Sequence, residues 1–226
     1  MKNNGFYQFQ KEHTQTPQVK ICGITSEREI KFINELDINY AGFVFAKSRR
    51  QVSVYEASRL CKALRGDIKA VGVFTDARPA EINTIAEICA IDIIQLHRCE
   101  DIEQGQFSLP VWKAVRVKDD KEEIIKQLEG PYDAFVLDTY EKDKAGGTGI
   151  VFNWHLARGL SEKRKIVLAG GLTADNVAEA IYMAKPHIVD VSSGVEGDIG
   201  KDEKKIKAFL HAVKHINILA YAPEKN

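Results

Sequence analysis

The chain has 226 residues, and its 32 Lys and Arg balance 32 Asp and Glu, so the formal net charge is zero. A neutral chain has no broad electrostatic attraction for nucleic acid or membranes, and we expect neither as a partner. No apolar run approaches the roughly 18 residues of a membrane span, and the polar start of the chain lacks the apolar centre of a signal peptide. Four cysteines without C-x-x-C spacing indicate reduced thiols and a cytoplasmic protein.

Short apolar runs alternate with helical patterns along the chain. The runs are Val19–Cys22, Tyr40–Phe45, Lys69–Phe74, Ile93–Leu96, Val111–Val115, Ala134–Leu137, Ile166–Ala169 and Ile188–Val191. Their nearly continuous Val, Ile, Leu and Phe content is typical of strands buried on both faces. Apolar residues at helical spacing lie between and after them, as in Ala80–Ala90 and Lys204–Val213. Thr173–Asn176 has the residue types of a helix start.

Eight strand candidates, each followed by a crossover, predict an α/β protein with a single (β/α)8 TIM barrel. A doubly wound open sheet is the alternative, because it has the same local alternation. No linker divides the chain, so we assign residues 19–226 to one catalytic barrel domain and residues 1–18 to an N-terminal arm. The long gap after Asp138 contains Gly146–Gly149, which we interpret as a loop over the site.

The last two predicted strands end in small residues. Gly170 and Gly171 follow one, and Ser192, Ser193 and Gly194 follow the other. Small residues at a strand end let backbone N–H groups approach an anion, and a following helix adds its positive dipole end. Two such turns in succession are typical of the phosphate site of a β/α barrel. The sequence therefore predicts a phosphorylated ligand.

Polar residues at the other predicted strand ends are candidates for the chemistry. Cys22 is either a functional thiolate, with its pKa lowered by an electropositive barrel mouth, or a small packing residue. Asp138 is either a general acid, with its pKa raised by partial burial, or a turn aspartate. Arg50 is either an anchor for a substrate carboxylate or a solvated loop charge. Asp190 is expected to accept hydrogen bonds from substrate hydroxyls or backbone groups.

Three further patterns are weaker evidence for a functional site. Cys61 and Cys89 lie on helical stripes and are expected in the core. His211 and His215 have i, i+4 spacing but lack a third metal ligand. Gly146–Gly149 is not followed by the Lys-Ser/Thr of a P-loop, so it is no nucleotide fingerprint. The sequence offers no convincing site for a metal or a redox cofactor.

Seven segments together resemble the phosphoribosylanthranilate isomerase family of tryptophan biosynthesis. They are Lys20–Thr25, Gly42–Phe45 with Lys47–Arg50, Gln95–His97, Leu137–Thr139, Gly146–Gly149 with Phe152–Trp154, Ala169–Leu172 and Asp190–Glu196. They occur in the family's order from about Val19 to the last helix.

The resemblance implies an aldose–ketose isomerase without a cofactor, which performs an Amadori rearrangement of N-(5-phosphoribosyl)anthranilate. It implies Cys22 as general base, Asp138 as general acid and Arg50 as the anchor of the anthranilate carboxylate. The implied substrate-binding set is Arg50, His97, Gly147, Gly170, Gly171, Asp190, Ser192, Ser193 and Gly194.

Two alternatives stay open beside this hypothesis. Another phosphosugar barrel, acting on an indole-glycerol phosphate or a ribulose phosphate, would usually rely on lysines or metal-binding histidines instead. A silent phosphate-binding barrel would bind a product analogue without turnover. We expect a monomer, with a homodimer as the alternative.

Overall fold

The computed structural model describes residues 16–97, 105–117, 120–139 and 153–216. Eight parallel strands in this part form a closed barrel, in which β1 also pairs with β8. They are β1 (Gln18–Cys22), β2 (Tyr40–Val44), β3 (Lys69–Thr75), β4 (Ile93–His97), β5 (Val111–Val117), β6 (Ala134–Thr139), β7 (Ile166–Leu168) and β8 (Ile188–Val191). The predicted (β/α)8 barrel is confirmed, and closure between β1 and β8 rules out an open sheet.

The apolar runs locate every strand, with small differences at the ends. β1 begins at Gln18, one residue inside the predicted arm; residues 1–15 lie outside the described part of the chain. β6 continues to Thr139, because its pairing with β5 extends through Arg116 and Asp138. β7 stops at Leu168, since Gly170 and Gly171 turn the chain with φ angles of 81° and 67°.

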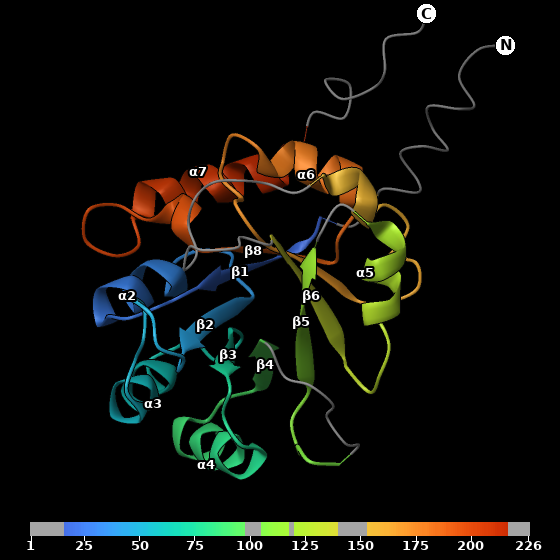
Figure 1. Cartoon of the computed structure of the whole chain (residues 1–226). Coiled ribbons are helices and arrows are strands. Elements are labelled where there is room, and N and C mark those ends of the chain that lie inside the picture. Colours follow the sequence, from blue (N-terminus) through green and yellow to red (C-terminus); the bar gives the residue numbers. More distant parts are fainter. Residues whose placement is uncertain (1–15, 98–104, 118–119, 140–152, 217–226) are drawn as a thin grey trace, which may run out of the picture.

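Helices surround the strands in Figure 1. They are α2 (Glu27–Asn34), α3 (Val54–Lys62), α4 (Pro79–Cys89), α5 (Lys121–Gln127), α6 (Val177–Ala184) and α7 (Glu203–Lys214), with 3-10 helices η1 (Trp154–Ala157) and η2 (Ser193–Val195). Ser26 and Ser53 form capping boxes that fix the starts of α2 and α3. The predicted helix start before α6 is confirmed, with Asn176 as its N-cap.

The core has two parts. Inside the barrel, the rings of Tyr40 and Trp112 meet edge to face at 5.1 Å near the N-terminal ends of β2 and β5. Between the barrel and the helices, a larger apolar cluster includes Cys61 and Cys89, as predicted. The lower interior is thus closed by apolar side chains, which leaves the C-terminal ends of the strands for polar ones.

In the described part of the chain, no helix combines the length and the apolar character needed to cross a membrane.

Candidate active site

Polar side chains gather inside the barrel where the strands end. Cys22, His97 and Asp138 lie at or near the ends of β1, β4 and β6. Side chains alternate between the two faces of a strand, so Asp138 shares the face of Ala134 and Val136, which belong to the interior cluster. The same alternation places Cys22 on the face of the fully buried Lys20. These strand ends form one polar mouth above the apolar interior.

Cys22 lies against β2, opposite Gly42. A Cβ atom built on Gly42 would lie 2.8 Å from Cys22 Sγ and 3.1 Å from Lys20 Nζ, so only glycine leaves room for both groups. Burial raises the pKa of the Cys22 thiol, and the nearby Lys20 opposes this only in part. The predicted lowering of the Cys22 pKa is therefore wrong, because burial outweighs the positive charges at the mouth.

Asp138 is half-buried near the end of β6, in register with Arg116 of β5. Going around the closed barrel from β6 to β1, β7 and β8 lie between Asp138 and Cys22. The carboxyl and the thiol therefore face the mouth from different sides.

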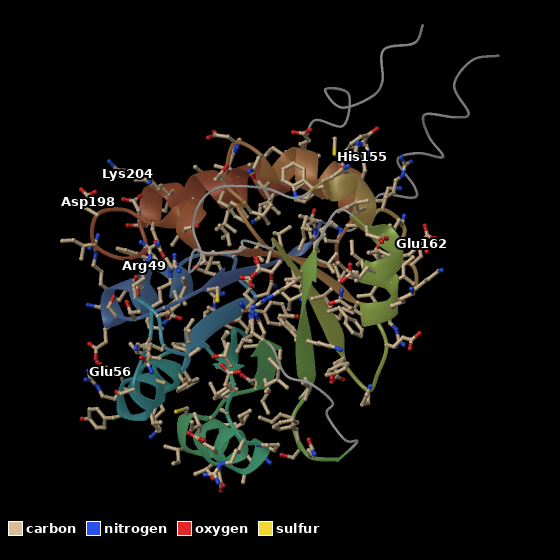
Figure 2. The ribbon with its side chains drawn as sticks, viewed as in Figure 1. Arg49, Glu56, His155, Glu162, Asp198 and Lys204 are labelled. Atoms are coloured by element: carbon tan, nitrogen blue, oxygen red, sulfur yellow. The ribbon has the colours of Figure 1, made fainter. Side chains whose placement is uncertain are left out.

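Arg50 reaches the mouth from the loop after β2. Its aliphatic stem packs against Gly23, where any side chain would collide with it. Its Nε donates to Glu196 Oε1, in the loop after β8, and Arg49 Nη2 lies 2.6 Å from Glu196 Oε2. Figure 2 shows Arg49 on the same side of the molecule as Asp198, which follows Glu196 in that loop. Arg50 Nη2 is buried and has no partner among the described residues.

His97 and Asp190 both have neighbours that orient them. Gln95 Nε2 lies 2.8 Å from His97 Nε2, and both side chains project from the same face of β4. Asp190 Oδ2 accepts a hydrogen bond from Lys20 Nζ at 2.7 Å, while its buried Oδ1 has no partner in the described structure. Asp190 is thus anchored by a buried cation that the sequence analysis did not assign.

The two small-residue turns touch each other. A Cβ atom on Gly194 would collide with the carbonyl oxygen of Leu172 and lie 3.2 Å from Thr173 Cα. Asn176 fixes the first turn by donating to the Gly171 carbonyl at 2.9 Å and accepting from Thr173 N at 2.8 Å.

Backbone donors remain available in these turns. The hydrogen bonds described for them leave the N–H groups of Gly171, Ser193 and Gly194 without a protein acceptor among the described residues. Ser192 differs, because its hydroxyl donates to the Cys22 carbonyl at 3.0 Å. The turns can therefore bind an anion through their backbone, with the Ser192 hydroxyl already engaged.

The segment Gly146–Gly149, which contains the predicted contact Gly147, and Phe152 lie outside the described residues. Three charged residues of the site were not predicted: Lys20, Glu196 and Lys201. Lys201 is buried after β8, and its Nζ lies 3.1 Å from Glu196 Oε1 and 3.0 Å from the Ser192 carbonyl. Lys20 could have been found from the sequence, because it is a charged residue within an apolar strand, two residues before Cys22. Glu196 and Lys201 depend on contacts between distant loops.

Within the described part of the chain, no three His, Cys, Asp or Glu side chains are grouped as a metal site would require. A cavity of about 400 Å³ lies at the opposite end of the barrel, between the start of β1 and α7, and contains none of the predicted site residues.

Residues 19–212 match the family described as N-(5'phosphoribosyl)anthranilate (PRA) isomerase. N-(5'-phosphoribosyl)anthranilate isomerase of Thermoanaerobacter sp. (strain X514) is 43% identical over 201 residues, which cover 88% of this chain and 98% of that protein. Phosphoribosyl anthranilate isomerase from Thermotoga maritima has a similar structure, with a TM-score of 0.79, 36% identity and coverage of 88% of this chain and 98% of that one. A phosphoribosyl anthranilate isomerase bound to reduced 1-(o-carboxyphenylamino)-1-deoxyribulose 5-phosphate has a TM-score of 0.75 at 35% identity, with the same coverage.

Proposed function

Because the chain belongs to the N-(5'-phosphoribosyl)anthranilate isomerase family, we propose that Cys22 and Asp138 are the base and the acid of its reaction. The chain isomerises N-(5'-phosphoribosyl)anthranilate to 1-(2-carboxyphenylamino)-1-deoxyribulose 5-phosphate in tryptophan biosynthesis. The observation that carries the proposal is that the thiol and the carboxyl face one mouth from strands separated by β7 and β8.

The reaction needs an acid and a base at different atoms of one sugar. Protonated Asp138 gives its proton to the ribose ring oxygen, and the C1–O bond breaks as the nitrogen lone pair forms a Schiff base. Cys22 thiolate then removes the proton from C2, and the electrons move to give the enolamine, which becomes the ketone. The first step requires Asp138 in its proton-bearing form.

Arg50 binds the anthranilate carboxylate in this proposal. Its Nη2 is a buried donor without a partner in the described structure, and Glu196 holds the other edge of the guanidinium. A carboxylate accepting from Nη2 would satisfy that donor, and charge-assisted hydrogen bonds of this kind are strong.

The phosphate binds the two touching turns, through the N–H groups of Gly171, Ser193 and Gly194. The positive φ of Gly170 shapes the first turn, and Ser192 joins the second to β1. His97 and Asp190 contact the sugar hydroxyls in this proposal, and the buried Oδ1 of Asp190 has no partner among the described residues. Gly147 remains a predicted substrate contact.

We also propose a cytoplasmic monomer. The proposed acid, the proposed base and the two touching turns all belong to one barrel. One Thermotoga maritima relative is described as dimeric, which makes the homodimer the alternative. Light scattering coupled to size exclusion separates the two states by mass.

The test is steady-state turnover of freshly generated phosphoribosylanthranilate, followed by its fluorescence. We expect Cys22→Ser and Asp138→Asn each to lose about a hundredfold or more in kcat, the usual scale for removing an acid or a base. Asp175→Asn is the matched control, because Asp175 is exposed in the loop after β7, and it should keep full activity.

Two outcomes would contradict the proposal. If Cys22→Ser retained turnover, the assignment of the Cys22 thiol as the base would be wrong. Binding of the reduced product analogue by the wild-type protein without any turnover would instead indicate a silent phosphate-binding barrel.

A further inference from the structure

Lys20 is a fully buried lysine in the middle of β1, two residues before Cys22. Lysines are almost never fully buried unless they are paired, and Lys20 is paired with Asp190 of β8 at 2.7 Å. Replacing such a buried ion pair by apolar residues is often neutral or stabilising. Stability alone therefore does not account for a lysine at this position.

The ammonium of Lys20 lies beside the thiol of Cys22. Both groups face the space above Gly42, where an added Cβ would lie 3.1 Å from Lys20 Nζ and 2.8 Å from Cys22 Sγ. Any residue larger than glycine at position 42 would push against both groups. The bare backbone of β2 thus permits the contact between the cation and the thiol.

Four charged groups surround Cys22 in the described structure. Lys20 comes from β1, Asp190 from β8, Lys201 from the loop after β8, and Arg50 packs on the adjacent Gly23. Lys201 is already engaged by Glu196 and the Ser192 carbonyl, and Arg50 is held by Glu196. Lys20 is the cation best placed to act on the thiol.

The electrostatic balance agrees with this placement. Burial raises the pKa of Cys22, and the charge of Lys20 is the largest opposing influence; Asp190 raises that pKa and Lys201 lowers it less. Burial is the largest single influence on Lys20 and would lower its pKa, but the charge and hydrogen bond of Asp190, together with those of Cys22, outweigh burial and raise the pKa of Lys20. Asp190 therefore keeps the ammonium charged at neutral pH.

We propose that Lys20 is a positioning residue that stabilises the thiolate of Cys22, with Asp190 holding its ammonium in place. The inference rests on Cys22 as the base of the proposed function. Cys22 must release its own proton to solvent before it can accept one from C2 of the sugar. An adjacent buried cation favours that anionic form, because the Coulombic attraction is weakly screened there.

The test is the pH dependence of alkylation of Cys22 by iodoacetamide, followed by mass spectrometry of the Cys22 peptide. Cys22 is partly exposed, so a small reagent can reach it. We expect Lys20→Met to raise the pKa of Cys22 by about one unit or more, which is the scale of a neighbouring opposite charge. In Lys20→Arg the pKa of Cys22 should return most of the way to that of the wild type. Because Lys20→Arg keeps the positive charge, recovery in this variant would follow the charge at position 20, which a merely structural role of the lysine would not explain.

A double variant keeps the test valid if Lys20→Met does not fold because Asp190 loses its partner. Lys20→Met with Asp190→Asn removes both charges, and Lys20 has the larger influence on Cys22. The pKa of Cys22 should then lie above that of the wild type but below that of Lys20→Met. An unchanged or lowered pKa of Cys22 in Lys20→Met or in the double variant would overturn the proposal.

Turnover provides the second readout. Lys20→Met should lower kcat most at neutral pH and least at alkaline pH, with a KM close to that of the wild type. An equal loss at every pH would also overturn the proposal. Alkylation needs no turnover, so failure of the isomerase mechanism would show in Cys22→Ser while leaving the alkylation series unaffected.

Discussion

Arg50 and Glu196 join two loops that are far apart in the sequence, through an ion pair between the loop after β2 and the loop after β8. Burial alone would raise the pKa of Glu196, but hydrogen bonding to Arg50 and the charge of Lys201 outweigh it and lower that pKa. Glu196 is therefore a stable carboxylate at neutral pH. It holds Nε of the guanidinium and leaves the buried Nη2 without a partner among the described residues.

This arrangement predicts a graded loss of substrate binding. Arg50→Met should raise KM about a hundredfold, the scale of removing one partner from a buried charge pair. Glu196→Gln should raise KM about tenfold, because it weakens a charge-assisted hydrogen bond while keeping the side-chain shape. In both variants kcat should change much less than KM, as steady-state kinetics can show.

Arg49→Gln is the matched control for the same carboxylate. Arg49 contacts the other oxygen of Glu196, but its side chain is 64% exposed, and exposed ion pairs contribute little. Its kinetics should stay within about twofold of the wild type. A KM for Glu196→Gln no higher than that of Arg49→Gln would contradict an anchoring role for Glu196.

The contact between the two turns gives a second prediction. Gly194→Ala would force the turn after β8 away from Leu172, at a cost of about 1–3 kcal/mol if the backbone shifts. The backbone donors of both turns would then no longer converge. Calorimetric titration should show weaker binding of the reduced product analogue, and urea unfolding should show lower stability.

Gly66→Ala serves as the comparison, because an added Cβ at Gly66 meets no atom within 4 Å. This variant should keep the affinity of the wild-type protein. An unchanged affinity in Gly194→Ala would mean that the two turns need not touch to bind the phosphate.

The barrel could be predicted because each strand buried on both faces forms a continuous apolar run within a short stretch of sequence. Each apolar run lies on one strand, and eight such strands joined by crossover connections leave few topologies. The same local pattern identifies Cys22 and Asp138 as candidates, because each is a polar residue at the point where an apolar run ends. The strand ends at Leu168 and Thr139 are less predictable, because glycine φ angles and pairing with a neighbouring strand decide them.

The electrostatics of the site could not be predicted in the same way. The pairing of Lys20 with Asp190 joins residues 170 positions apart, and that of Arg50 with Glu196 joins residues 146 apart. No local spacing encodes such contacts, which exist only once the barrel closes. The direction of the Cys22 pKa depends on this closure too, since burial and the positions of the charges decide it together.

The pKa of Cys61 predicts how the free energy of unfolding changes at alkaline pH. Burial, and then the nearby Cys89 and Asp92, raise the pKa of Cys61 in α3 to about 12. A thiol in the unfolded chain has a pKa of about 8.5, so between these values the folded state holds a proton that the unfolded state releases. The contribution of Cys61 is complete below about pH 8.5 and declines above it, by about 1.4 kcal/mol per pH unit.

Cys61→Ala isolates this contribution. The variant should lose a constant amount of stability from packing, and its free energy of unfolding should fall less steeply than that of the wild type between pH 8.5 and 9.5, by about 1 kcal/mol over that unit. Urea unfolding at a series of pH values under reducing conditions measures both effects. Parallel curves for the two proteins would show that Cys61 keeps an ordinary pKa in the folded state, and that burial in α3 does not control its ionisation.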